Sequence, residues 1–228
     1  MGSSTVVNEV LSLPIGHHAK LRSDVSTFTS ALLNCHPAIS GFDPSIVVLP
    51  RRLHFTLGAI TLLSTLRPRI MELLDGHKLR AGLERMDILK PERGDPKSAH
   101  VLYVGPDLAS DDGLRLLAVG GRQAFRSPLL SLHCTMINTQ YRRPRARGPR
   151  QPFSYASIVE SAALRAIALS PASSTTALSS EGSQRRAKQI PPIPVKLGVW
   201  DVDEIQICEM GSSGPEGEYV RVGGCSLA

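Results

Sequence analysis

The first half of the chain alternates strand-like and helical patterns of apolar residues. Apolar and polar positions mix over Val6–Leu13, which predicts a strand that ends at Pro14. The next apolar positions are spaced four, three and four apart, as on the buried face of an amphipathic helix: Leu21, Val25, Phe28 and Leu32. Two apolar runs follow, Ile46–Leu49 and Leu53–Leu57, and Pro50 between them indicates two separate strands.

The second half repeats this order of elements. Ala99–Val104 is a strand-like run closed by a Gly-Pro pair. A helix is expected over Asp111–Val119, with Ser110 as its N-cap and two glycines after its last turn. Leu129–Ile137 is then the next predicted strand. Each half therefore reads strand, helix, strand, although the two halves share little sequence.

Further elements lie outside these two units. A helix is expected after Pro68, with Gly76 as its end and three residues directed inward, namely Ile70, Leu73 and Leu74. Apolar residues from Val199 to Ile207 predict a strand that runs toward Cys208. Glu218–Val222 predicts a final strand. Mixed strands and helices of this kind indicate the α/β class.

The composition suits one folded domain over residues 1–228. Hydrophobic residues make up 42% of the chain, enough for a core, and aromatic residues only 4%, so that core depends on aliphatic side chains. No apolar run approaches the roughly 18 residues of a membrane span, which excludes an integral membrane protein. Four scattered cysteines without a C-x-x-C pair argue for an intracellular protein, nuclear or cytoplasmic, and against a zinc ribbon.

The candidate chemistry lies in two short segments, one in the last strand of each unit. They read Leu53-His54-Phe55-Thr56-Leu57 and Leu132-His133-Cys134-Thr135-Met136. Because side chains alternate between the two faces of a strand, His and Thr of each segment share one face and the apolar residues share the other. Each strand would thus present an imidazole and a hydroxyl while its opposite face is anchored in the core.

This pattern suits a phosphoryl group. In-line displacement at phosphorus needs a base at the attacking oxygen and an acid at the leaving oxygen. Histidine serves both tasks near pH 7, since its usual pKa is about 6.5. We therefore expect His54 and His133 to be catalytic and Thr56 and Thr135 to bind phosphate oxygens, with the choice of base and acid left open.

At these motifs the sequence resembles the two-histidine phosphoesterase superfamily, whose signature is a pair of His-x-Thr/Ser motifs. More narrowly, it is similar to the phosphoesterase domain shared by A-kinase anchor protein 7 and activating signal cointegrator 1 complex subunit 1. The stretches that carry the resemblance span nearly the whole chain: 11–16, 50–58, 99–104, 131–139 and 202–210.

The resemblance implies a bilobal α/β fold with an internal pseudo-twofold axis and antiparallel-rich sheets flanking a central cleft. It implies a phosphoric diester hydrolase that needs no metal or other cofactor. The implied substrates are RNA ends or short oligonucleotides, through opening of 2′,3′-cyclic phosphates or cleavage of 2′-5′ linkages. The alternative is a subunit that binds nucleic acid or protein without turnover, in a nuclear transcription-coactivator or DNA-repair complex.

Two segments stand apart from the predicted elements. Five arginines interrupted by Pro and Gly form a basic loop over residues 142–150, which fits an RNA backbone contact, a nuclear-import signal or a solvated loop. The candidate RNA contacts there are Tyr141, Arg142 and Arg143, in keeping with the net charge of +6. Residues 170–189 contain eight Ser or Thr and one large aliphatic residue, so we expect a disordered insertion.

Overall fold

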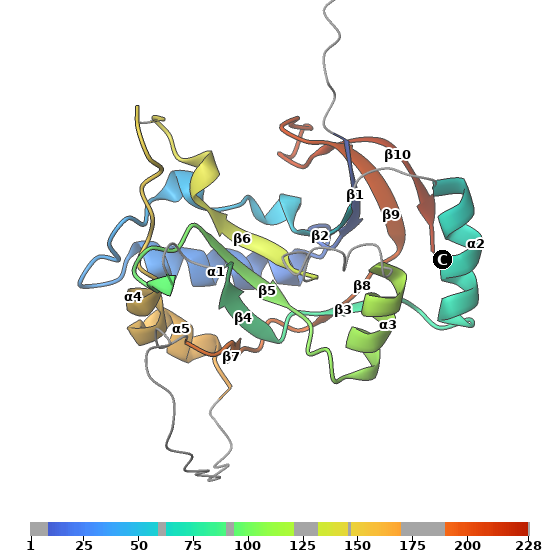
Figure 1. Cartoon of the computed structure of the whole chain (residues 1–228), viewed down its shortest axis with the longest axis horizontal. Coiled ribbons are helices and arrows are strands. Elements are labelled where there is room, and N and C mark those ends of the chain that lie inside the picture. The colour runs from blue at the N-terminus through green and yellow to red at the C-terminus, as the bar shows by residue number, and fades with distance from the viewer. Residues whose placement is uncertain are drawn as a thin grey trace, which may run out of the picture.

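The computed structural model describes residues 9–58, 63–89, 94–120, 132–145, 147–169 and 190–227. These residues form a mixed α/β fold built on a large antiparallel sheet, as the sequence predicted (Figure 1). None of the helices within the described ranges has the length and apolar character needed to span a bilayer. The expected insertion at 170–189 and the start of the first predicted strand, 6–8, lie outside the described residues.

Eight strands form the main sheet, in the order β10-β9-β1-β2-β6-β5-β4-β7. Their bounds are β1 Glu9–Pro14, β2 His54–Gly58, β4 Arg85–Ile88, β5 Val101–Gly105, β6 Cys134–Asn138, β7 Ile193–Pro194, β9 Glu204–Glu209 and β10 Val220–Ser226. A smaller sheet pairs β3 (Arg80–Gly82) with β8 (Val199–Asp201).

The main sheet consists of two corresponding halves. The unit β1-α1-β2, with α1 at Ala19–Leu33, lies in one half, and β5-α3-β6, with α3 at Asp111–Gly120, lies in the other. The two strands of each unit pair antiparallel with each other. On its outer edge, β1 also pairs with β9, and β5 also pairs with β4. The strand–helix–strand repeat predicted from the sequence is therefore confirmed, and β2 and β6 are the strands at which the halves meet.

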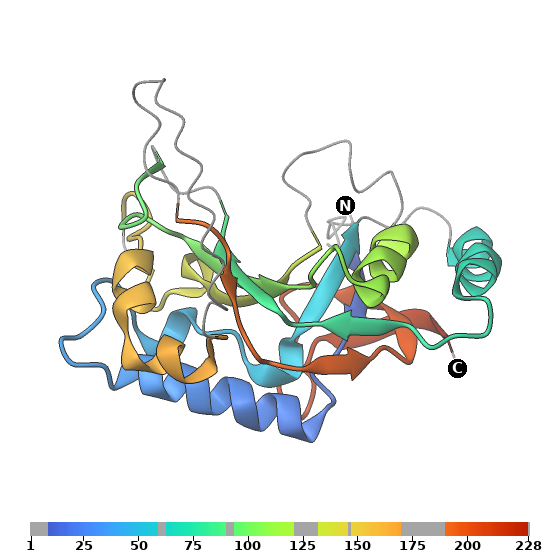
Figure 2. The same cartoon turned by 90° about the horizontal axis from the view of Figure 1, so that it is seen from below.

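Helix α1 confirms the prediction made from its apolar spacing. It runs along one face of the sheet (Figure 2), and its four predicted apolar residues are all buried. The cap predicted for α3 is also present, since the Ser110 hydroxyl accepts a hydrogen bond from the backbone N–H of Gly113 at 3.0 Å. Two short helices that the sequence did not suggest, α4 (Tyr155–Glu160) and α5 (Ala162–Ile167), lie beside α1 (Figure 1).

The helix expected after Pro68 differs from the prediction. Helix α2 spans Leu63–Leu74, so Pro68 lies inside it rather than at its start. Ile70 and Leu74 are buried as predicted, but Leu73 is 44% exposed. Ile70 and Leu74 are four residues apart and share the buried face of the helix, whereas Leu73 is one residue before Leu74 and points away from the core.

Three predicted strands also need correction. Of the strand predicted over Leu129–Ile137, residues 129–131 lie outside the described residues and β6 begins at Cys134, so His133 directly precedes the strand. Ile46–Leu49 lies between two 3-10 turns, Pro44–Ile46 and Pro50–Arg52, and its pairing among the described residues is an isolated bridge from Val47 to Ile137. Both turns begin at a proline, which lacks the N–H that a ladder requires. The single strand predicted over Val199–Ile207 is divided into β8 and β9.

Candidate active site

The two His-x-Thr segments meet where the halves of the sheet join. Phe55 of β2 is paired antiparallel with Cys134 of β6, and both side chains are fully buried. In an antiparallel ladder the neighbouring residues then oppose each other in reverse order. His54 therefore lies across from Thr135, and Thr56 lies across from His133, which immediately precedes β6.

The four polar residues share one face of the sheet. Side chains alternate along a strand, so His54, Thr56 and Thr135 point away from the face that carries Phe55 and Cys134. His133 directly precedes β6, and its ring lies beside that of Tyr103, the partner of Thr135 on β5. The four residues occupy the corners of a square in which the two imidazoles lie on one diagonal and the two hydroxyls on the other. Diagonal neighbours in antiparallel strands are roughly 7–8 Å apart, a separation that a tetrahedral phosphoryl group can bridge.

His54 is held in a single orientation. Its Nδ1 lies 2.7 Å from the carbonyl oxygen of Arg52, which can only accept, so Nδ1 carries the proton. Its Nε2 lies 3.3 Å from the Thr56 hydroxyl and keeps its lone pair on the side of the shared face. Burial lowers the pKa of His54 from its usual 6.5, and the charge of nearby His133 lowers it further, against the opposing effect of the Arg52 carbonyl.

His133 lies against an aromatic residue of β5, Tyr103. The rings of His133 and Tyr103 have centroids 5.2 Å apart, and Tyr103 is paired with Thr135 across β5 and β6. The Tyr103 hydroxyl donates to Asp87 of β4 at 3.4 Å. Burial raises the pKa of this carboxyl above its usual value, although hydrogen bonds from Ile88 and Tyr103 oppose the shift.

Tyr219, which the sequence did not single out, forms a wall beside His54. The two rings meet edge to face at 5.6 Å and 87°. The guanidinium of Arg52 covers the Tyr219 ring at 4.7 Å, and the Tyr219 hydroxyl lies 3.3 Å from that of Tyr141. Tyr141, a candidate RNA contact, is thus connected to the site through Tyr219.

A pocket of about 440 Å³ opens next to His54. Its floor comes from β1, β9 and β10, and residues 214–219 of the β9–β10 connection form a side wall. Because the sheet order is β9-β1-β2-β6, this pocket lies on the side of His54 away from His133. Among the residues that the structure describes, His54 lines it and His133 does not.

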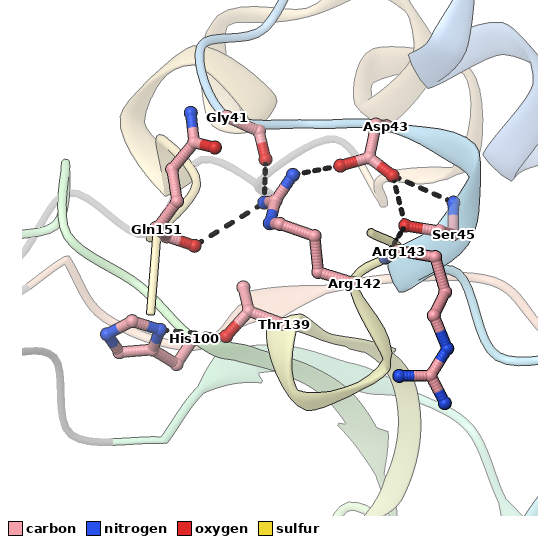
Figure 3. Close-up of polar contacts among 8 residues, drawn as sticks. All are labelled: Gly41, Asp43, Ser45, His100, Thr139, Arg142, Arg143 and Gln151. Carbon is pink, nitrogen blue, oxygen red and sulfur yellow. Dashed lines mark hydrogen bonds and ion pairs between the residues drawn. The ribbon is translucent and has the colours of Figure 1, made fainter. Parts of the chain in front are cut away.

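Arg142 is placed differently from the RNA contact that we expected. Its guanidinium pairs with Asp43 and donates to the carbonyl oxygens of Gly41 at 2.6 Å and Gln151 at 3.4 Å (Figure 3). Only 15% of its side chain is exposed. The arginine therefore fastens its loop to the segment after α1.

The rest of the basic loop is more open. Arg143 is exposed, and its backbone N–H donates to the Ser45 hydroxyl at 2.9 Å (Figure 3). His100, the residue before β5, has its Nδ1 2.8 Å from the buried Thr139 hydroxyl. An anionic ligand could reach Arg143 from solvent, whereas His100 supports the turn that carries Tyr141.

Comparisons with known proteins found similarity at the level of structure alone. The sequence matches no family model, and no curated protein matches it either. The solved structures that resemble it include E. coli LigT with 3′-AMP, at 13% identity and a TM-score of 0.45 over 98% of this chain and 99% of LigT. A second is TT0787 of Thermus thermophilus, at 16% identity and a TM-score of 0.45 over 96% and 97% of the two chains. A third, described only as a phosphoesterase, has 15% identity and a TM-score of 0.43 over 97% and 98%. Likeness of this degree assigns no activity to the chain.

Proposed function

We propose that the protein is a metal-independent phosphoesterase that acts on phosphodiester or cyclic-phosphate groups of RNA ends or short oligonucleotides. One observation carries the proposal. The pairing of Phe55 with Cys134 brings two His-x-Thr motifs from separate halves of the chain onto one face of the sheet. A purely structural role would not require an imidazole and a hydroxyl from each strand at the same junction.

The environment of His54 suits it to the role of general base. Its Nδ1 proton is held by the Arg52 carbonyl, so Nε2 is the ring nitrogen that accepts, and the lowered pKa of His54 favours the neutral ring near pH 7. Nε2 would take a proton from water or from a ribose hydroxyl as that oxygen attacks phosphorus. His133, at the opposite corner of the square, would donate a proton to the leaving oxygen as its bond to phosphorus breaks.

The two threonines would serve the remaining phosphate oxygens. Thr56 and Thr135 lie on the other diagonal, so their hydroxyls can donate to the non-bridging oxygens on either side of the reaction axis. Negative charge builds on those oxygens in the transition state, where preformed donors stabilise it. The Thr56 hydroxyl is 3.3 Å from His54 Nε2, a contact that a bound phosphate would replace.

The resemblance of the two motifs to the two-histidine phosphoesterases supports the choice of RNA ends as substrate class. It favours 2′,3′-cyclic phosphates and 2′-5′ linkages. The exposed Arg143 would add electrostatic attraction for the RNA backbone. A nuclear coactivator or repair complex is the setting that the same resemblance suggests for the protein.

Turnover of defined substrates in EDTA tests the proposal. The panel holds a 2′,3′-cyclic nucleotide and a 2′-5′ oligonucleotide, each with the wild type, His54→Ala, His133→Ala and the control His77→Ala. His77 is exposed on the connection after α2, so its loss should leave the rate unchanged. Each catalytic variant should lose about 10²- to 10⁴-fold in rate. Binding of oligonucleotide without turnover by the wild type would instead favour the non-catalytic subunit.

A further inference from the structure

Arg52 joins the turn before β2 to the connection between β9 and β10, residues 210–219. Its Nε donates to the carbonyl oxygen of Gly217 at 2.5 Å, and its Nη2 donates to that of Ser212 at 3.0 Å. Its guanidinium also covers the ring of Tyr219 at 4.7 Å. Ser212 and Gly217 follow Arg52 in the chain by 160 and 165 residues, so this arginine fastens two distant segments to each other.

The same residue holds two of the groups that contact the His54 ring. The Arg52 carbonyl accepts the Nδ1 proton of His54 at 2.7 Å. Tyr219, whose ring the guanidinium covers, meets the imidazole edge to face at 5.6 Å. In a neutral histidine the hydrogen bond at one ring nitrogen decides which nitrogen keeps its lone pair. The placement of Arg52 therefore bears on both the orientation and the tautomer of His54.

The partners of the guanidinium are backbone carbonyls and an aromatic ring rather than a carboxylate. Among the residues that the structure describes, none of the carboxylates forms an ion pair with Arg52, whereas its neighbour Arg51 pairs with Glu216 of the connection. Two donors of one rigid, planar group reach the two carbonyls, which a lysine ammonium on a flexible stem does not reproduce. Arg52 therefore supplies a fixed geometry in addition to its charge.

The connection that receives Arg52 is held in shape by its own hydrogen bonds. The Ser212 hydroxyl donates to the carbonyl oxygen of Glu209 at 2.6 Å and accepts from the backbone N–H of Val220 at 2.8 Å. The N–H of Gly217 donates to the carbonyl oxygen of Gly214 at 3.0 Å. Gly217 has a φ of +84°, which glycine adopts without the steric cost that other residues incur. The fold of the connection thus fixes both carbonyls that bind Arg52.

We propose that Arg52 is a positioning residue of the site, which sets the orientation and tautomer of His54 according to the fold of the β9–β10 connection. This inference rests on the phosphoesterase function proposed above, in which His54 Nε2 accepts a proton. The guanidinium binds the connection and the carbonyl binds Nδ1, so Arg52 acts through His54 rather than on the substrate. When Arg52 is displaced, Nδ1 loses its acceptor, and the ring is free to turn or to carry its proton on Nε2.

Arg52→Lys tests the role of the guanidinium, because lysine keeps the charge but does not hold both carbonyls. We expect kcat for the 2′-5′ oligonucleotide to fall about 10²-fold while KM changes little, as for a misplaced catalytic group. The control is Arg165→Lys, since Arg165 is exposed on α5 and donates to the carbonyl oxygen of Glu160; it should match the wild type. A rise in KM at unchanged kcat would show that Arg52 binds the substrate itself, and an unchanged rate would show that charge alone suffices. Either result would overturn the inference.

The tautomer of His54 gives a readout that does not depend on turnover. Two-bond ¹H–¹⁵N spectra of the labelled full chain are recorded at about pH 8, where the ring is neutral because its pKa lies below 6.5, and His54→Asn identifies the signals. The wild type should carry the proton on Nδ1, whereas part of Arg52→Lys should carry it on Nε2. An unchanged tautomer in the variant would overturn the inference. If the wild type cleaves no substrate, the proposed function fails, and these spectra still decide the role of Arg52.

A change in the connection tests the coupling while Arg52 stays in place. Gly217→Ala puts a side chain at a φ of +84° and should displace the carbonyl that Arg52 Nε binds. The control is Gly76→Ala, with a φ of +75° after α2 and, among the described residues, no contact within 4 Å of the added Cβ. Gly217→Ala should lower kcat and shift the tautomer of His54 in the same direction as Arg52→Lys, and Gly76→Ala should change neither. Thermal unfolding reports whether each variant is folded, and equal behaviour of the two folded glycine variants would contradict the coupling.

Discussion

Phe55 lies directly opposite Cys134 in the antiparallel pairing of β2 with β6, and both side chains are completely buried. Among the described residues, this is the one paired position of the ladder between β2 and β6, the strands that join the halves of the sheet. Its register decides which residues of the opposite face come together. A shift by one residue would turn one His-x-Thr motif into the core and its apolar neighbours outward.

Truncation of Phe55 should therefore be costly for stability. We expect Phe55→Ala to lower the free energy of unfolding by about 3–5 kcal/mol, because it removes a fully buried ring and leaves a cavity. Urea denaturation measures the loss. The matched control is Leu114→Ala, since Leu114 is 52% exposed on α3 and its truncation should cost no more than about 0.5 kcal/mol. Similar losses for both variants would contradict the burial pattern.

The sequence could predict the site residues because the spacing that marks them lies within a single strand. Alternation along a strand has a period of two, so the shared face of His54 and Thr56 follows from their spacing alone. The spacing of apolar residues on α1 is equally direct. The relative register of β2 and β6 could not be predicted, because it depends on pairing between segments far apart in the chain.

Other parts of the site could not be predicted, because they also depend on contacts between segments far apart in the chain. Tyr219 reaches His54 through the folding of the β9–β10 connection, and no local pattern marks it. The ion pair of Arg142 was not predicted either, because a run of arginines is normally solvated. Its burial depends on Asp43, which precedes it by almost a hundred residues, and on two backbone carbonyls. Sequence composition records the charge of a loop but not the partner that neutralises it.

Substitution of Arg142 should lower the stability of the protein, whereas substitution of its neighbour Arg143 should leave stability unchanged. Arg142→Met removes the partner of Asp43, and we expect the free energy of unfolding to fall by about 2 kcal/mol, less than for a fully buried pair because Asp43 remains 31% exposed. Arg143→Met should leave stability within about 0.5 kcal/mol of the wild type. If RNA contacts the loop, the Arg143 variant should also bind oligonucleotide with a smaller dependence on salt. Urea denaturation and titrations at several salt concentrations measure the two effects, and a stable Arg142 variant would count against its anchoring role.

The ring of Tyr219 should matter more for activity than its hydroxyl. Tyr219→Ala removes the aromatic contact with His54 and the cation–π contact with Arg52, so kcat/KM should fall about tenfold. Tyr219→Phe keeps the ring and loses the hydroxyl, with its hydrogen bonds to Tyr141 and Arg52, and should stay within about threefold of the wild type. Steady-state kinetics on one dinucleotide compares the two variants. Equal losses would assign the effect to the hydroxyl instead of the ring.

The lowered pKa of His54 predicts a defined response to acid. In the unfolded chain the imidazole gains its proton as pH falls through 6.5, whereas the folded protein resists protonation until a lower pH. The unfolded state therefore binds more protons over that interval, and the stability that neutral His54 contributes is lost as the pH falls from above 6.5 through the folded pKa.

Two measurements check this response. Between about pH 7.5 and 5.5 the free energy of unfolding should drop more in the wild type than in His54→Asn, because asparagine does not titrate. The control variant His77→Asn, at an exposed position, should behave like the wild type. The acid limb of kcat/KM should have its midpoint below 6.5, since activity persists until the base is protonated. A midpoint above 6.5, together with equal acid sensitivity of the His54 variant, would remove the basis for assigning His54 as the base.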